Sequence, residues 1–247
     1  MNYSIESIAI VAAAFLVAGL VKGAAGMGLP PIALGLTTLV VPVSEALALL
    51  TVPTLVTNTW QALYGGHFRA MLRRFWLMGL MMVIGVLIAA RGLKALGSPQ
   101  SAGWLGVMLV LFSIAALTAW RPRVSPQAES WANPLCGLAT GIIGGIAGVA
   151  AIPFLPYMQS LQILRDELVQ GLGILFVVFT AALTVALWDV GALNAGNLTG
   201  AALATLPTML GVWLGQRFRF AISPEAFRKF FLVVLLGLGL NLARALV

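Results

Sequence analysis

Lys22 is the residue whose chemistry most needs an explanation, because it lies inside an apolar stretch and beside glycines. A charge in the membrane interior is expensive, so an ionisable residue within a span is by default a functional hypothesis. Its ammonium group could meet an anion directly. The alternative is that Lys22 lies near an interface and extends its ammonium to water.

Lys22 belongs to the first of two glycine-rich runs that interrupt apolar sequence and then meet proline, residues 19–31 and 137–153. Broken helix at membrane depth is tolerated only inside protein or along a water-filled cavity. Paired breaks in matching places of two halves indicate a transporter's substrate site. The candidate binding residues in these runs are Gly23, Gly26, Gly28, Thr140, Gly141, Gly144 and Gly145.

These runs allow two interpretations that do not exclude each other. Helices that begin after Pro30-Pro31 and Pro153 would present unpaired N–H groups and a positive dipole end to an anion. Alternatively, the glycines allow close helix packing, as small residues do in membranes. Thr140 is neutral where the first run has Lys22, so any positive site is asymmetric.

Further polar side chains could donate to an oxyanion. Thr51, Thr54, Asn58 and Gln61 are spaced to share one helix face, and Gln170 lies in the corresponding part of the second half. The alternative role for these side chains is hydrogen bonding between helices. His67 follows Gly65-Gly66, which favours a solvated histidine in a loop.

The composition predicts a polytopic membrane protein. The 247 residues are 61% hydrophobic and 9% charged, whereas a soluble domain has about 25% charged residues. Apolar runs of about 20 residues are long enough to cross the bilayer. We expect spans at residues 5–28, 45–64, 74–92, 102–120, 131–150, 167–188, 196–217 and 226–246.

The same composition excludes other classes of protein. Most lysines and arginines lie at span ends, so the net charge of +7 indicates topology and lipid contact rather than nucleic-acid binding. Cys136 is the single cysteine and His67 the single histidine, so we expect no metal site. No nucleotide, zinc-hydrolase or serine-hydrolase motif occurs, so we expect no cofactor and no enzyme activity.

The sequence predicts one membrane domain, 1–247, made of two repeats, 1–126 and 127–247. Gly19, Gly23 and Gly26 match Gly137, Gly141 and Gly144, and further pairs match at one constant offset. Those pairs are Thr54 with Thr180, Gly65 with Gly191, Gly85 with Gly211, and Arg91 with Arg217. Prolines and mixed charge argue against helix in the linker at 121–130.

The fold class is therefore all-α, a duplicated helical repeat with broken or re-entrant helices at 29–43 and 151–164. If these short segments cross, the repeats are inverted, five spans plus five; if they do not, the repeats are parallel, four plus four. The positive-inside rule favours the inverted arrangement, because it puts three basic groups on the cytoplasmic side and the Asp189 loop, which has no positive charge, outside. The basic residues concerned are Arg69, Arg73, Arg74, Arg121, Arg123, Arg217, Arg219, Arg228 and Lys229.

The glycine-rich openings, His67-Phe-Arg69 and the Gly-x5-Arg ends at Gly85 and Gly211 resemble the sulfite exporter TauE/SafE family. The resemblance covers nearly the whole chain and implies transport of small anions such as sulfite or sulfonates. We expect a secondary transporter in the cell membrane, most simply a bacterial inner membrane, with alternating access at the glycine-rich breaks. The expected partners are a small anionic substrate and lipid, and a homodimer is compatible with the sequence.

Two alternatives stay open at this stage. An anion channel could have the same lining, and single-channel steps would distinguish it from a saturable carrier. A membrane scaffold or accessory subunit would move no anion by itself. Substrate identity, direction and ion coupling are not specified by these residues.

Overall fold

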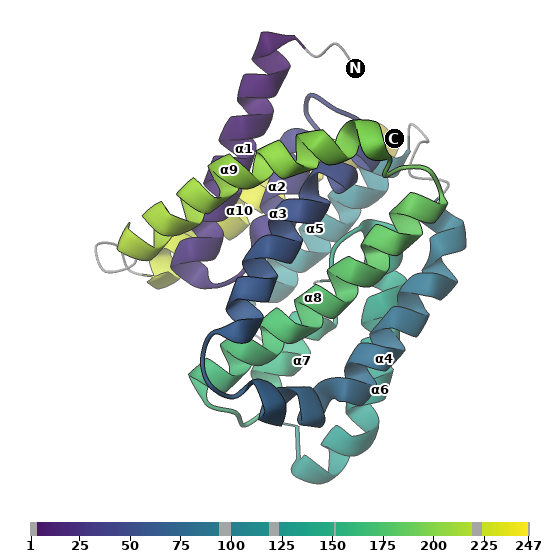
Figure 1. The fold of residues 1–247 in the computed structure, drawn as a ribbon, viewed down its shortest axis with the longest axis vertical. Helices are drawn as coiled ribbons and strands as arrows, with labels where there is room; N and C mark the ends of the chain where they lie inside the picture. Colours follow the sequence, from purple (N-terminus) through teal and green to yellow (C-terminus); the bar gives the residue numbers. More distant parts are fainter. Residues whose placement is uncertain (1–3, 94–99, 119–123, 151, 219–223, 247) are drawn as a thin grey trace. The chain divides into compact units, whose positions relative to one another are not determined.

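A computed structural model describes residues 4–93, 100–118, 124–150, 152–218 and 224–246. The described residues form helices and no strands, which confirms the all-α prediction (Figure 1). Arg121, Arg123 and Arg219 of the charge argument lie outside these residues. The helices are α1 Ile5–Ala25, α2 Leu29–Thr37, α3 Val43–Leu63, α4 Phe68–Leu93, α5 Ser101–Leu117, α6 Pro126–Ala147, α7 Phe154–Ser160, α8 Arg165–Asp189, α9 Ala195–Phe218 and α10 Pro224–Ala243, followed by a short 3₁₀ turn, η2 Arg244–Leu246.

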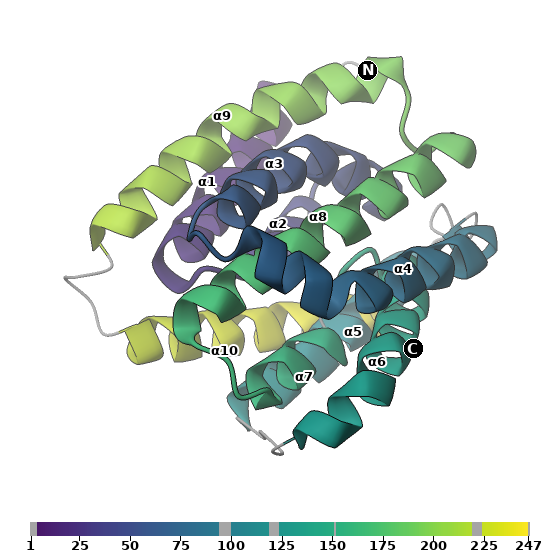
Figure 2. The ribbon, with the colours of Figure 1, turned by 60° about the horizontal axis from the view of Figure 1, so that its bottom comes forward.

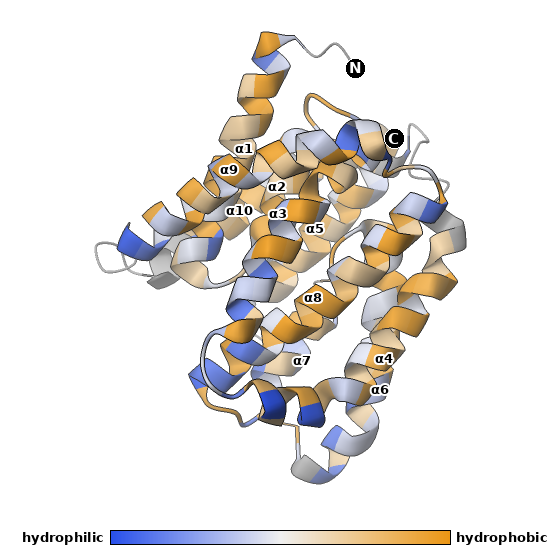
Figure 3. Ribbon diagram, in the orientation of Figure 1, coloured by the Kyte–Doolittle hydropathy of each residue, from blue (hydrophilic) through white to orange (hydrophobic). Residues whose placement is uncertain are grey.

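Five helices in the described ranges are long and apolar enough to cross a membrane: Ile5–Ala25, Phe68–Ala90, Arg165–Asp189, Ala195–Arg217 and Lys229–Leu246. The apolar part of α5 is shorter, Ala102–Leu117. Apolar residues dominate the helices in Figure 3, and hydrophilic residues gather where α4 and α8 begin. This is a multi-pass membrane protein.

The two short predicted segments are helical pieces that cannot cross a bilayer as helices. The helix α2 has 9 residues and α7 has 7. At about 1.5 Å per residue they extend roughly 14 and 10 Å, against a hydrocarbon core of about 30 Å. The described backbone after them, at residues 38–42 and 161–164, is non-helical, so the prediction of broken helices is correct in form.

The linker prediction was wrong at its end. Residues 126–130, expected outside helix, form the first turn of α6. The Ser125 side chain accepts a hydrogen bond from the Ala128 N–H, and a proline stands in the first turn, where its missing N–H is harmless. The Ser125 cap therefore starts the helix at Pro126, although the prolines and mixed charge of the linker had argued against helix there.

The described chain divides into two compact units, and each combines helices from both sequence halves. Unit 1 is 1–54, 95–117 and 192–247; unit 2 is 55–94 and 118–191. The helix α3 contributes its first part to unit 1 and its second part to unit 2.

Unit 1 is built on the close packing of α1 against α9. A methyl group at Gly19 or Gly23 would collide with the backbone carbonyl of Thr208 or Val212. The partner glycines of α9, Gly211 and Gly215, meet the α1 backbone at Leu16 and Leu20 in the same way. Residue numbers rise together along the contact, so α1 and α9 run in the same direction.

Unit 2 repeats this packing with α4 and α6, which lie side by side in both views (Figures 1 and 2). A methyl group at Gly137 or Gly141 would collide with the carbonyl of Met78 or Met82. Gly85 of α4 approaches the α6 backbone, where a methyl group would lie 2.5 Å from the Leu138 oxygen and 2.8 Å from the Gly141 Cα. These two helices also run in the same direction.

Two further contacts give helix directions. In unit 2 a methyl group at Gly171 would lie 3.6 Å from the Phe75 ring, and one at Gly79 3.5 Å from Leu175, so α8 runs parallel to α4. In unit 1 a methyl group at Gly106 would lie 2.4 Å from the Ala243 nitrogen, whereas Gly103 approaches Leu246. The helices α5 and α10 are therefore antiparallel.

We predict that Gly141→Ala lowers the melting temperature, because the added methyl group must push α4 from α6 at a cost of about 1–3 kcal/mol. Gly237→Ala is the matched control, since nothing lies within 4 Å of that position in α10. Unfolding in detergent can be followed with a thiol-reactive dye that reports exposure of buried Cys136. Equal melting temperatures for the two variants would contradict close packing at Gly141.

Candidate anion site

The junction between α1 and α2 is the first of the two predicted breaks. The helix α1 ends at a left-handed cap, Gly26 (φ 77°), whose N–H donates to the Lys22 carbonyl at 2.7 Å. Gly28 (φ 99°) then starts α2. Positive φ at both positions needs glycine, and Gly26 has nothing within 4 Å of where a Cβ would be. These two glycines form the break itself.

Lys22 lies one turn before this break. Its side chain is buried, with the residue 7% exposed. Ala18 and Phe15, on the same side of α1 one and two turns earlier, are completely buried. The last turn of a helix carries a partial negative charge, which favours a cation there. The ammonium is thus held within unit 1, at the C-terminal end of α1.

The start of α2 offers fewer hydrogen-bond donors than the sequence suggested. The helix begins at Leu29, before the two prolines rather than after them. Pro30 and Pro31 have no N–H, so two of the donors that a helix N-terminus usually presents are missing. In unit 2, α7 begins after Pro153 and contains Pro156, with the same result.

The second break lies one helical turn later than the glycine match indicated. The left-handed cap of α6 is Gly148 (φ 75°), not Gly144. A methyl group at Gly144 would lie 2.9 Å from the Phe179 ring, and one at Gly145 2.6 Å from the Ala89 Cβ. Counting back from the caps, Gly144 rather than Thr140 corresponds to Lys22. The second break therefore has a phenyl ring where the first has an ammonium.

The predicted glycines have different surroundings. Gly26 and Gly28 form the break, whereas at Gly23, Gly141 and Gly145 a neighbouring helix occupies the space that a Cβ would need. Thr140 is fully buried, and its hydroxyl lies 3.9 Å from the Cys136 sulfur. The packing interpretation describes most of this set.

The polar stripe of α3 is buried except at its end. Thr51, Thr54 and Asn58 are 1–3% exposed. The Thr51 hydroxyl donates to the Ala48 carbonyl of its own helix at 2.7 Å. Gln61, which is less buried, donates to the Val169 carbonyl at 2.9 Å. In the parts that the structure describes, Thr51 belongs to unit 1 and Asn58 and Gln61 belong to unit 2.

Gln170 holds the turn between α3 and α4. It is completely buried; its amide donates to the Ala62 carbonyl at 2.8 Å, and its oxygen accepts from the His67 N–H at 2.7 Å. The side chain thereby satisfies two backbone groups at a helix end and a helix start. His67 itself is partly exposed and lies 3.8 Å from Glu167.

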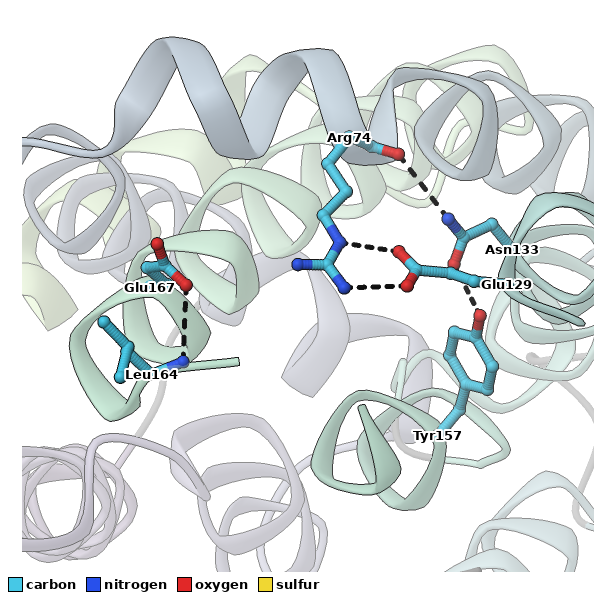
Figure 4. Close-up of polar contacts among 6 residues, drawn as sticks. All are labelled: Arg74, Glu129, Asn133, Tyr157, Leu164 and Glu167. Atoms are coloured by element: carbon cyan, nitrogen blue, oxygen red, sulfur yellow. Dashed lines mark hydrogen bonds and ion pairs between the residues drawn. The ribbon is translucent and has the colours of Figure 1, made fainter. Parts of the chain in front are cut away.

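Sequence reasoning missed a polar cluster at the start of α4. It interpreted Arg74 as a topological anchor, but the guanidinium makes a bidentate pair with Glu129 of α6 (Figure 4). The distances are 2.6 Å from Nε to Oε1 and 2.7 Å from Nη2 to Oε2. The two residues are 55 positions apart in the sequence, so no local spacing of residues predicts that they form a pair.

The sequence matches a known family along nearly its whole length. The model of the family described as Sulfite exporter TauE/SafE matches residues 11–242. The chain belongs to this family. Membership makes it a membrane transporter of the sulfite or anion exporter type. No curated protein and no solved structure matches the chain significantly. Among the described residues, no group of three or more His, Cys, Asp or Glu side chains could hold a metal ion.

We predict that Gln170→Ala destabilises the protein without weakening anion binding. The change leaves the Ala62 carbonyl and the His67 N–H without this partner, at about 1–3 kcal/mol for each buried group left unsatisfied. Gln61→Ala removes a single hydrogen bond at a less buried position and serves as the control for the melting temperature. Melting temperature and sulfite affinity are measured on both. Normal melting with lost affinity would instead make Gln170 a substrate ligand.

Proposed function

We propose that the protein is a secondary transporter of small sulfur-containing oxyanions or organosulfonates that works by alternating access. Family membership supports transport of this kind. The observation that carries the anion assignment is buried Lys22, one turn before the glycine break after α1. An ammonium held inside a membrane protein beside interrupted backbone attracts an anion more strongly than it would in water, because the local dielectric constant is low.

The roles of the other predicted residues follow from their contacts. Gly26 and Gly28 let the backbone approach an anion bound at Lys22, since neither carries a side chain there. Thr51 supplies a hydroxyl within the same unit. In unit 2, we keep Asn58, Gln61 and Thr140 as candidate hydrogen-bond donors to the anion. We assign Gly23, Gly141, Gly144, Gly145 and Gln170 to the scaffold that holds these groups.

We further propose the duplicated, inverted five-plus-five topology. Successive crossings alternate in direction, so α8 can run parallel to α4 only if the segment containing α7 returns the chain across the membrane. The antiparallel pair α5 and α10 requires the same return. The parallel pair α1 and α9 then requires that the segment containing α2 also crosses. The matched glycine contacts of α1 with α9 and α6 with α4 support the duplication.

We predict the following labelling pattern from this topology. In a Cys136→Ser background, single cysteines at Ala70 and Gln127 react with an impermeant reagent from the cytoplasmic side, and a cysteine at Ala195 reacts from outside. All three positions are exposed. The parallel four-plus-four arrangement puts Gln127 and Ala195 on the same side. Labelling of all three from one side would therefore overturn the inverted topology.

We predict that Lys22→Met weakens anion binding tenfold or more. A charge-assisted hydrogen bond contributes about 1.5–3 kcal/mol, and about 1.4 kcal/mol is a tenfold change in Kd. Lys22→Arg should lose less affinity than Lys22→Met, because the positive charge remains. It should still bind more weakly than the parent, because a planar fork replaces a compact ammonium. Exposed Lys229→Met is the control and should bind like the parent.

The measurement is sulfite and methanesulfonate affinity by thermal shift on purified protein, with flux into liposomes as a second readout. Saturable flux that is stimulated by anion on the opposite side supports a carrier. Wild-type affinity in Lys22→Met would remove Lys22 from the site. Single-channel steps would replace the carrier mechanism with a channel.

A further inference from the structure

The pair of Arg74 and Glu129 is enclosed rather than freely exposed. The side chain of Arg74 is 33% exposed and that of Glu129 14%. Both oxygens of the carboxylate are engaged by the planar fork of the guanidinium, which is the geometry that arginine offers to any oxyanion of similar shape. Glu129 thus occupies a position that suits a sulfonate or a sulfite.

A network around the pair joins it to the broken helix of unit 2. The Asn133 amide donates to the Arg74 carbonyl at 3.5 Å, and its oxygen accepts from the Tyr157 hydroxyl at 2.6 Å. Tyr157 lies on α7, the short helix after the second break. The pair and this network therefore tie the starts of α4 and α6 to α7 (Figure 4).

The charged and titratable groups around Glu129 come from each packed helix. They are Arg74 on α4, Tyr157 on α7 and Glu167 on α8, the last acting on Arg74. In Figure 4 the third nitrogen of the Arg74 guanidinium points toward the side of Glu167, whose carboxylate caps the start of α8 through the Leu164 N–H at 3.3 Å. His67 faces Glu167 from the turn before α4. Glu129 is the carboxylate that accepts hydrogen bonds from both Nε and Nη2 of Arg74.

We propose that Arg74 is a second anion site whose occupant in the absence of substrate is Glu129, and that protonation of Glu129 exchanges this carboxylate for the transported anion. This inference rests on the proposed anion transport and adds its ion coupling. Ionised Glu129 accepts two hydrogen bonds from Arg74 and balances its charge, and these bonds hold the pKa of Glu129 below its ordinary value. When an arriving oxyanion takes the fork, the displaced carboxylate loses this partner and binds a proton. The neutral acid carries no charge and is a weaker acceptor, so it does not compete with the oxyanion for the guanidinium.

Charge balance makes the coupling stoichiometric. One proton neutralises Glu129, and one monoanion replaces its negative charge beside Arg74, so the local charge is the same before and after. Anion without a proton would put two negative groups on one guanidinium, and a proton without an anion would leave a partly enclosed guanidinium without a counter-charge. The proton and the anion therefore move together and in the same direction.

The test follows methanesulfonate and protons in liposomes containing the purified full chain. Methanesulfonate stays a monoanion near neutral pH, unlike sulfite, so it carries no proton of its own. Radiolabel reports the anion, and an internal pH dye reports the proton. In the wild type we expect internal acidification that accompanies methanesulfonate uptake and stops when the anion is withheld.

Glu129→Gln keeps the shape and removes the titratable group. After folding is checked, we expect the number of protons that enter per methanesulfonate taken up to fall toward zero. Glu129→Asp should restore this ratio, and Glu167→Gln, the neighbouring carboxylate outside the fork, should leave it unchanged. Arg74→Lys should raise the methanesulfonate concentration needed for half-maximal uptake by about tenfold or more, since the fork is lost.

Proton entry that persists in Glu129→Gln, or its absence in a wild type that takes up methanesulfonate, would overturn this inference and leave the proposed transport intact. A wild type that takes up no methanesulfonate would overturn sulfonate transport, and with it the coupling. If Glu129→Gln does not fold, loss of the proton signal in Glu167→Gln but not in Glu129→Asp would also count against the assignment to Glu129.

Discussion

Backbone-to-backbone approach of helices is the constraint on which this structure depends. Lipid is as apolar as leucine, so burying leucine between helices provides little of the driving force that it provides in water. Helices associate instead where small residues let their backbones come close. Gly19 and Gly23 on α1, and Gly137 and Gly141 on α6, do this at one-turn spacing against α9 and α4. The strongest helix pairs in both units are built in this way.

Once these pairs are fixed, buried polar groups must be satisfied around them. At the start of α4 the backbone ends of two helices meet, and the Gln170 amide supplies partners for both. Close by, the Arg74 guanidinium joins α4 to α6, and Tyr157 adds α7. Polar side chains here form the hydrogen bonds that water would form at the surface of a soluble protein.

Much of the fold could be predicted from the sequence, because span length and glycine patterning are local properties. The ends of α8 and α9 lie within two residues of the predicted ends, and each of the two short predicted segments contains a short helix, α2 or α7. The position of the second break was missed by one turn. Gly144 and Gly148 are both glycines in apolar context, and only the backbone shows which one has positive φ.

The candidate site was harder to predict than the fold. Lys22 could be singled out because a charge in an apolar run is unusual by itself. The pairing of Arg74 with Glu129 could not, since it depends on α4 and α6 being neighbours, which no spacing in the sequence specifies. Gln170 shows a different difficulty: its residue type suits an oxyanion, whereas its side chain forms hydrogen bonds with two backbone groups.

The two prolines at the start of α2 bear on how fast a cargo could leave. Pro30 and Pro31 remove N–H groups that would otherwise hold an oxyanion in one orientation. Under the proposed function, recognition at this junction depends on the charge of Lys22 more than on donors of the α2 N-terminus, and therefore on the charge of the cargo more than on its shape. A helix end with few donors would then account for both rapid unloading and a broad choice of cargo.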